Sequence, residues 1–400
     1  MRVLYINHTG VAGGAEQSLF GLLDTLPPRV DPLLASPRGP LHEHAARRGI
    51  PATSIAEVAG SLRLHLLHTP LALGAMATAS AGVVHAAHRW QADVLHANSI
   101  RAGMIAAPAA QILRRPLILH VRDCLPPCLL TRRLQRSLAK RARAVIAISG
   151  HVGRAFDPDG AAPRLDVIDD PFDLTRLDPA RFDREAARTR LALPPDAKVL
   201  ALVGQITPWK GQEDAIRAMA IVRRVHPTAV LLIVGETKFV RRATRYDNLA
   251  YLNRLHELVA RLSLGESVRF LGERDDVPAV MGACDMSLAP SWEEPFGRVV
   301  VEAMAMGVPV VATSVGGPAE TIRDGIDGLL VPPRQPEALA DVIVGLLNDA
   351  QRRNAIGALA RCTALGRFAH GLHAAAVTTI YRDVLGATDT VVAATDTVVA

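Results

Sequence analysis

Aromatic residues, cysteines and long apolar runs are all scarce in this chain of 400 residues. Aromatic side chains make up 4% of it, too few for the stacking platforms on which proteins bind single-stranded nucleic acid. The four cysteines lack the CxxC pairs of a zinc site, which indicates free thiols in a reducing cytosol. No apolar run reaches 18 residues, and the N-terminus has no signal-peptide core. These absences predict a cytoplasmic protein that spans no membrane and binds no nucleic acid.

The motifs of several well-known enzyme classes are absent as well. The sequence contains no GxxxxGK[ST], HExxH or GxSxG, which excludes a P-loop nucleotidase, a zinc protease and an α/β-hydrolase elbow. The glycines of 10–14 follow a predicted strand without the GxGxxG spacing of a dinucleotide site. Asp157-Pro-Asp159 has a central proline and a following glycine, which favours a turn over a metal-binding pair. We therefore expect no metal and no resident cofactor.

What the chain does contain is typical of a globular protein. Hydrophobic residues make up 49% and charged residues 21%, and the length suits about two domains. Residues 1–195 hold 24 Lys and Arg against 16 Asp and Glu, whereas residues 196–400 hold 21 against 23. The net charge of +6 therefore lies in the first half. We expect that half to meet something anionic.

Short β-branched runs alternate with helical patterns, which predicts βαβ units and parallel sheets of the α/β class. The expected strands lie at 3–6, 93–97, 117–121, 144–149, 166–168, 199–204, 230–235, 268–272, 286–290, 308–313 and 328–331. Pro194-Pro195 cannot continue a helix, so we expect doubly wound domains over 1–193 and 194–367. A helix at 368–386 is expected to pack back towards the first domain. Residues 387–400 repeat ATDTVVA in tandem, and we assign them no function.

The segment 290–320 carries the chemistry. Pro295 and Gly297 fit the start of a helix, so the backbone amides of Phe296, Gly297 and Arg298 should form an anion site at a strand's carboxyl end. Glu294 and Glu302 flank this helix start. A carboxylate repels a phosphate unless it binds hydroxyls, so the ligand should be both phosphorylated and polyhydroxylated. Either carboxylate taken alone is better explained as a helix cap or a solvated group, whereas the pair around PFG, with GGPAE after the next strand, favours a ligand site.

These residues resemble a known family. Glu294-Pro-Phe-Gly-Arg-Val-Val-Val-Glu302 is similar to the E-x7-E signature of the retaining glycosyltransferases of family 4, and EAMAMGVPVVA and GGPAE follow in the family's order. GGAE at 13–16 resembles its glycine-rich first loop, and DVLHANS at 93–99 resembles one of its strands. The resemblance implies the GT-B fold, two facing Rossmann-like domains with the donor cleft between them. VIDDPFD at 167–173 departs from the family, because Asp170 and Pro171 replace a common Asn-Gly.

The resemblance also implies residue roles. The donor would be a nucleotide-diphosphate sugar, with UDP favoured over GDP, held mainly by the C-terminal domain without a metal. The implied catalytic residues are His120, which contacts the donor sugar, Lys210, which neutralises the departing diphosphate, and Glu294, which binds the sugar hydroxyls. The implied donor-binding residues are Gly13, Gly14, Gln205, Phe296, Gly297, Arg298 and Glu302, the last on the ribose. Arg122 and Asp123 are candidates for the acceptor side.

Gln205 lies in GQITPWKG, where many relatives have arginine in G-R-x-x-x-x-K-G. Glutamine offers only a neutral donor, and charge-assisted hydrogen bonds are roughly twice as strong as neutral ones. We expect Arg298 to supply the missing cation. Gln205 also keeps a second function open, a catalytically silent sugar-nucleotide-binding partner of another transferase. A third, a GT-B sugar-nucleotide epimerase, should lack EPFG.

The acceptor is expected to be a hydroxyl on an oligosaccharide, a lipid-linked glycan or a small molecule. Residues 131–144 hold six Lys and Arg and no acid, and Leu130, Leu134 and Leu138 recur at helical spacing. Such a basic amphipathic helix can lie on the anionic inner face of a membrane. An ordinary Arg-rich surface helix explains the same pattern.

Overall fold

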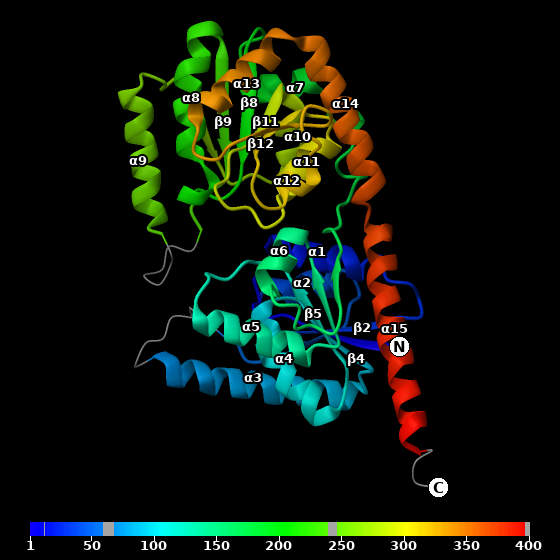
Figure 1. Ribbon diagram of the computed structural model, residues 1–400. Coiled ribbons are helices and arrows are strands. Elements are labelled where there is room, and N and C mark those ends of the chain that lie inside the picture. The colour runs from blue at the N-terminus through cyan, green and yellow to red at the C-terminus, as the bar shows by residue number, and fades with distance from the viewer. Residues whose placement is uncertain (12, 59–67, 239–245, 397–400) are drawn as a thin grey trace. The chain divides into compact units, whose positions relative to one another are not determined.

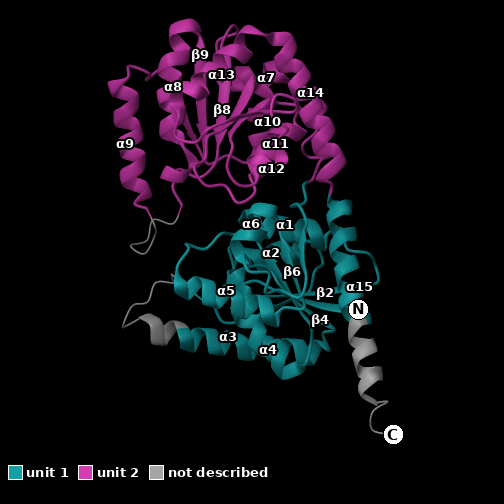
Figure 2. Ribbon diagram, in the orientation of Figure 1, with its two compact units in different colours: residues 1–172, 370–400 teal, residues 173–369 magenta. Residues whose placement is uncertain are grey.

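The computed structural model describes residues 1–11, 13–58, 68–238 and 246–396, and the side chains of these except 68–72 and 387–396. The chain forms two compact units (Figure 2). The first comprises Met1–Phe172 with His370–Ala400, and the second comprises Asp173–Ala369. Each unit is described separately below. Among the described residues, none of the helices combines the length and apolarity that crossing a bilayer requires.

The first unit is built on a parallel sheet of seven strands in the order β3-β2-β1-β4-β5-β6-β7. Its strands are β1 (Arg2–Ile6), β2 (Asp31–Ser36), β3 (Ala52–Ser54), β4 (Val94–Ala97), β5 (Leu117–Val121), β6 (Ala144–Ala147) and β7 (Leu165–Val167). The order reverses between β1 and β4. This is the topological switch point, where open α/β sheets bind ligands beyond the strands' carboxyl ends.

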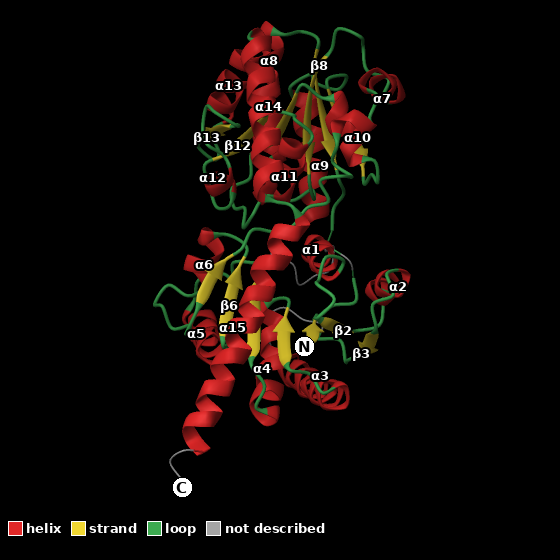
Figure 3. Ribbon diagram, turned by 90° about the vertical axis from the view of Figure 1, so that its right-hand side faces the viewer, coloured by secondary structure: helices red, strands yellow, loops and turns green. Residues whose placement is uncertain are grey.

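Seven helices belong to the described part of this unit. They are α1 (Gly14–Leu23), α2 (Pro40–Arg47), α3 (His68–Trp90), α4 (Ile100–Leu113), α5 (Leu129–Arg141), α6 (Gly150–Phe156) and α15 (His370–Asp396). Although α15 comes last in the chain, it lies against the first sheet (Figure 3) and contributes Val377, Ile380, Tyr381 and Val384 to the core around Val3.

The second unit repeats the architecture with six parallel strands in the order β10-β9-β8-β11-β12-β13. These are β8 (Lys198–Val203), β9 (Ala229–Val234), β10 (Val268–Gly272), β11 (Met286–Ala289), β12 (Val310–Thr313) and β13 (Leu329–Val331). Its helices are α7 (Arg184–Arg190), α8 (Gln212–Val225), α9 (Asn248–Arg261), α10 (Val277–Ala283), α11 (Arg298–Ala305), α12 (Pro318–Thr321), α13 (Pro336–Asn348) and α14 (Ala350–Arg367), with 3-10 turns η1 (Pro179–Arg181) and η2 (Pro208–Lys210). Figure 1 labels most of these elements.

Alternate residues of the central strands explain why both faces of this sheet are covered. Leu200 and Leu202 of β8 join one buried cluster, and Val199 and Ala201 join another. Both faces are therefore apolar, as parallel sheets with helices on each side require. The switch point lies between β8 and β11.

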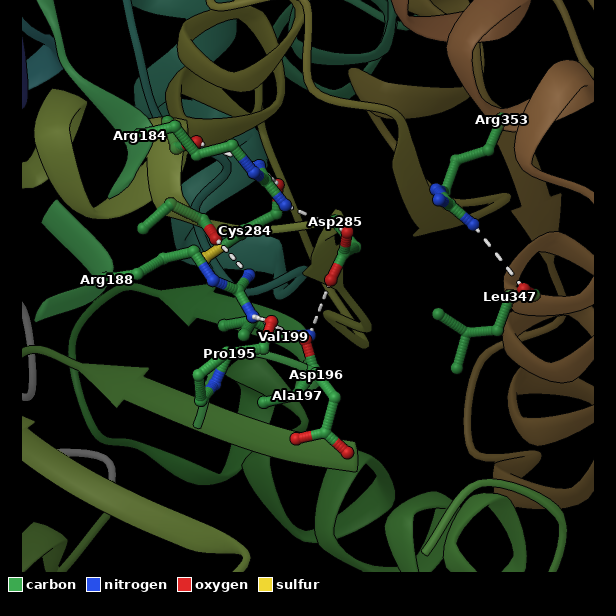
Figure 4. A network of polar contacts seen from close by, with 12 residues as sticks. Arg184, Arg188, Pro195, Asp196, Ala197, Val199, Cys284, Asp285, Leu347 and Arg353 are labelled. Atoms are coloured by element: carbon green, nitrogen blue, oxygen red, sulfur yellow. Dashed lines mark hydrogen bonds and ion pairs between the residues drawn. The ribbon is translucent and has the colours of Figure 1, made fainter. Parts of the chain in front are cut away.

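The predicted domain boundary near 194 is wrong, because the units divide at 172/173. Helix α7, which precedes Pro194-Pro195, packs on α10 of the second unit. Arg188 of α7 is 5% exposed and donates to the backbone carbonyls of Ala283 and Ala197 (Figure 4). Arg184 pairs with Asp285 at 2.9 Å. The two prolines thus lie in a loop inside the second unit.

The C-terminal boundaries also differ by a few residues from those expected. Helix α14 ends at Arg367, and α15 begins at His370 and continues to Asp396, well past the expected end at 386. The duplicated stretch thus begins within α15. Its side chains and residues 397–400 lie outside the described part of the chain.

Candidate active site

In the second unit, the predicted site residues gather at the switch point. Lys210 ends the turn η2 after β8, and Glu294 lies in the loop after β11. The Lys210 Nζ lies 2.6 Å from Glu294 Oε2, and the two side chains are 14% and 8% exposed. The hydroxyl of Ser291 donates to the same carboxylate oxygen over 3.1 Å. A cation and a carboxylate are thus held together, mostly out of water, where the fold places its ligands.

Close backbone contact between the loop after β8 and the loop after β11 brings Lys210 and Glu294 together. Gly211 has φ 71°, and a Cβ there would lie 2.0 Å from the carbonyl oxygen of Pro290. Only glycine allows this approach without strain. Two residues earlier, the carbonyl of Trp209 accepts a hydrogen bond from the amide of Trp292 at 2.7 Å.

A second pair of glycines supports Glu294 from the loop after β12. A Cβ on Gly316 would lie 1.9 Å from the Glu294 carbonyl oxygen, and one on Gly317 would lie 2.2 Å from that of Phe296. The Gly317 amide also donates to the Glu294 carbonyl over 2.9 Å. The sequence marked this GG pair as a family motif without a role, and the structure shows that it sets the backbone position of Glu294.

The remaining donor-side residues surround the start of α11. Gly297, with φ 91°, is the N-cap, and the buried ring of Phe296 packs edge-on against Phe368 at 6.1 Å. Glu302 lies one turn beyond Arg298, and both side chains are half-buried. Burial raises the pKa of the Glu302 carboxyl above its usual value, and the positive charge of Arg298 opposes that rise most strongly.

Gln205 points to a different loop. Its side-chain amide donates to the carbonyl of Lys238 over 3.2 Å, and its own carbonyl accepts the side chain of Gln212 at 2.9 Å. The glutamine therefore links the loops after β8 and β9.

In the first unit, a chain of hydrogen bonds crosses the switch point. The Gly13 amide donates to Glu16 at 2.9 Å, and the other oxygen of Glu16 accepts Asn7 at 3.1 Å. The side chain of Asn98 donates to Asn7 at 3.1 Å and accepts Arg122 Nε at 2.9 Å. Gly13 and Arg122, predicted for different roles, thus belong to one network. Asn7, Glu16 and Asn98 were missed, although the last two lie within the quoted family motifs.

Arg122 is also paired with Asp170, and the two side chains are 3% and 4% exposed. The pair explains why an aspartate occupies the position where the family commonly has asparagine. It also uses the Arg122 guanidinium within the core, whereas the next residue, Asp123, is exposed. Gly14 is the first residue of α1.

His120 lies within β5, which matches the expected strand at 117–121, and its side chain is fully buried. Its Nδ1 lies 3.3 Å from His96 Nε2, and its ring stacks on that of His373 at 5.8 Å. Burial, and then the charge of Arg122, hold the pKa of His120 well below the usual value of 6.5. Its Nε2 has no hydrogen-bond partner in the described part of the chain, and the contact of His120 with the donor sugar stays a prediction.

No three His, Cys, Asp or Glu side chains converge as metal ligands would in the parts of the chain that the structure describes.

The exposed charges that the sequence singled out lie on α5. Of the three leucines in the predicted apolar stripe, Leu138 is 2% exposed and Leu134 half-buried, so these two pack inward and Leu130 does not. Leu129 and Leu130, 77% and 51% exposed, precede the first basic residues.

Known protein families match the sequences of both units. The family described as "Glycosyl transferases group 1" matches residues 183–362, and "Glycosyltransferase Family 4" matches residues 12–176. The Anabaena protein Alr3699/HepE, solved in complex with UDP, is 31% identical, with a TM-score of 0.82 over 96% of this chain and 100% of that one. Its complex with UDP-glucose gives 30% and 0.80 over 96% and 100%.

Curated relatives match over a shorter stretch. The D-inositol 3-phosphate glycosyltransferase of Salinispora tropica is 38% identical over 226 residues, which are 55% of this chain and 46% of that protein. That of Nocardia farcinica is 36% identical over 58% and 49%. The chain thus spans about half the length of the curated relatives it matches. Together, the two matched families, the HepE likeness and the two parallel-sheet units show that the chain belongs to glycosyltransferase family 4 and has the GT-B fold.

Proposed function

We propose that this protein is an active glycosyltransferase that moves a sugar from a UDP-sugar to a hydroxyl acceptor with retention of the anomeric configuration. The Lys210–Glu294 pair at the switch point of the second sheet carries the proposal. It places a cation for a diphosphate beside a carboxylate for sugar hydroxyls. The structures of HepE with UDP and UDP-glucose favour UDP over GDP as the carrier.

In this proposal the charge of each residue determines which part of the donor it binds. Lys210 neutralises the diphosphate as it leaves, Glu294 accepts hydrogen bonds from the donor sugar, and Glu302 accepts those of the ribose. The amides of Phe296 and Gly297 at the start of α11 face the phosphates. Gly13 and Gly14 allow the first unit's loop to approach the diphosphate. In a front-face transfer, the C1–O bond to phosphate breaks, the C1–O bond to the acceptor forms on the same face, and the acceptor proton passes to the leaving phosphate oxygen. Fixed charges of this kind supply rate without a metal.

Glu294→Gln tests the proposal directly. With a panel of UDP-, GDP- and dTDP-sugars, the wild type should hydrolyse one donor slowly and transfer it when a suitable acceptor is added. The variant should lose about 10²–10³-fold in turnover, as expected for removal of a charged group that touches the reacting sugar. Glu293→Gln, which changes the exposed neighbouring carboxylate, is the matched control and should retain turnover. UDP binding without turnover of any donor would instead establish the silent-partner function.

The acceptor side belongs to the first unit in this proposal. Asp123 is exposed after β5 and is the better candidate for contact with an acceptor hydroxyl than the buried Arg122. The excess of basic residues in 1–195 suits an acceptor that carries phosphate. The inositol phosphate in the names of the curated relatives is one such acceptor.

A peripheral contact with the anionic inner face of a membrane remains part of the proposal, with Leu129 and Leu130 as the inserted residues. They are exposed at the start of α5, ahead of Arg132 and Arg133. We expect the protein to sediment with phosphatidylglycerol vesicles and not with phosphatidylcholine vesicles, and the double change of both leucines to serine to weaken this about tenfold. Equal binding of variant and wild type would show that α5 is an ordinary basic surface helix.

Arg298→Ala tests whether Arg298 replaces the arginine that Gln205 displaces. The change should lower turnover about as much as Lys210→Ala, because Arg298 would be the second cation on the leaving group. Gln205→Arg in the Arg298→Ala background should recover at least part of the loss. Wild-type steady-state kinetics for Arg298→Ala would show that no compensation exists.

A further inference from the structure

Two of the chain's three tryptophans lie beside the Lys210–Glu294 pair, and the predicted chemistry uses neither. The Lys210 Nζ lies 4.4 Å from the ring centroid of Trp209, well inside the range of cation–π attraction. The two residues are neighbours in the turn η2. Successive side chains in such a turn point about 120° apart, so the lysine must fold back over the ring. This contact is not a by-product of the backbone conformation.

The Lys210 ammonium is thereby restrained on two sides. It donates one hydrogen to Glu294 at 2.6 Å and faces the Trp209 ring with another part of its surface. An ammonium has three hydrogens, so one remains for a ligand. The charges of Lys210 and Glu294 already sum to zero, so a second carboxylate in place of the ring would make the site negative and repel a diphosphate. An aromatic face restrains the cation without adding negative charge.

Trp209 is held in turn by the loop that carries Glu294. Its carbonyl accepts the amide of Trp292 at 2.7 Å. The indole of Trp292 donates to Asp214 over 2.6 Å, and the guanidinium of Arg334 lies 4.3 Å from its ring centroid. The backbone of Trp209 is therefore held by the loop after β11, at a residue whose own side chain is fixed on two sides.

We propose that Trp209 is a positioning residue that aims the Lys210 ammonium at the nucleoside diphosphate of the donor. The inference rests on the proposed function of Lys210. Because Gln205 leaves Lys210 as the sole cation of this loop, the Trp209 ring has a larger role here than it would have in a chain with two cations in the loop. The ring acts through the lysine and does not touch the reacting atoms.

The test is a double-mutant cycle of Trp209→Leu and Lys210→Met, with kcat, donor KM and the Kd of UDP measured for each variant. Trp209→Leu should lower kcat about 3- to 30-fold, the range that cation–π contacts span, and should weaken UDP binding. Trp209→Phe, which keeps an aromatic face, should stay within about threefold of the wild type. Neither change should have any further effect in the Lys210→Met background.

Trp90→Leu is the matched control, because Trp90 at the end of α3 also lies under a cation, the Arg2 guanidinium, at 5.9 Å, but belongs to the other unit. It should leave kcat unchanged. A loss from Trp209→Leu that is as large without Lys210 as with it would overturn the inference. If the leucine variant does not fold, the cycle can be built on Trp209→Met, which also removes the aromatic face. If the wild type binds UDP but transfers no sugar, the proposed function is refuted and this inference is not. The double-mutant cycle would then be measured through the Kd of UDP.

Discussion

Lys210→Met will lower turnover by about 10²–10³-fold, the effect seen when one preorganised group is removed from a developing negative charge. The lysine is the cation nearest to Glu294, and no second cation of the loop replaces it. The same change leaves the Glu294 carboxylate, 8% exposed, without its ionic partner and with only the hydrogen bond from Ser291. A buried charge that loses its counter-ion costs about 1–3 kcal/mol, so the free energy of unfolding should fall as well.

Two further variants separate catalysis from stability. Lys210→Met with Glu294→Gln removes both charges, which should restore most of the unfolding free energy and none of the turnover. Lys238→Met is the control, because Lys238 also lies 2.6 Å from a glutamate, Glu273, but both side chains are more than half exposed. Loss of this exposed ion pair should lower the free energy of unfolding by less than about 1 kcal/mol and should leave turnover unchanged. Steady-state kinetics and urea unfolding check these outcomes. A Lys210→Met protein that keeps wild-type turnover would remove the lysine from the mechanism.

Acid will destabilise the first unit steeply. Its core holds His96, His120 and His373 in contact with one another. Burial lowers the pKa of His96 to about 3 and that of His373 to about 4, and it lowers that of His120 as well. The unfolded chain has pKa values near 6.5 and therefore binds more protons than the folded chain as the pH falls below that value. Stability is thus greatest above pH 6.5 and is lost towards pH 4.

The expected loss is large. A fully titrating histidine contributes at most about 1.4 kcal/mol per pH unit, so His96 and His373 together remove about 3 kcal/mol between pH 6.5 and pH 5, and His120 adds to this loss. That is a large share of the stability of a typical domain. Urea unfolding at pH 7, 6 and 5, followed by hydrogen exchange of β4 and β5, measures it.

Replacing one of the three buried histidines tests whether they cause the pH dependence of the unfolding free energy. His120→Gln should reduce the pH dependence of the unfolding free energy by about one proton, whatever it does to stability at pH 7. His88→Gln, which changes an exposed histidine on α3, should leave the slope as it is. If both variants keep the wild-type slope, the acid sensitivity comes from groups outside the histidine cluster.

Local sequence patterns predicted most strands and missed those that lack such a pattern. All six strands of the second sheet were expected, because each is an apolar run followed by a turn. In the first sheet β2 and β3 were missed. Strand β2 begins with Asp31-Pro32, a pair that usually signals a turn, and β3 has only three residues with one partner strand, β2. The position of β2 follows from pairing with β1, and that of β3 from pairing with β2, and neither pairing is a local property of the sequence.

In the candidate site, too, local motifs identified individual residues but not the contacts between residues distant in the sequence. EPFG and the following glycines identified the family and brought Glu294 into view, but the contact between Lys210 and Glu294 joins residues 84 positions apart. The pairing of Arg122 with Asp170 and the burial of His120 are equally non-local. The prolines at 194–195 were misread because a local helix-breaking signal does not reveal that α7 packs on α10.

The return of α15 to the first sheet has a consequence for synthesis on the ribosome. Residues 173–369 form the second unit without interruption, whereas the first needs Val377, Ile380 and Tyr381 to complete its core. The half that is translated first must therefore wait, with its apolar surface around Val3 uncovered, until the whole of the other half has emerged. The second unit can fold as soon as it leaves the exit tunnel. The order of folding is then the reverse of the order of translation, and nascent residues 1–172 are the part of the chain that most needs a chaperone.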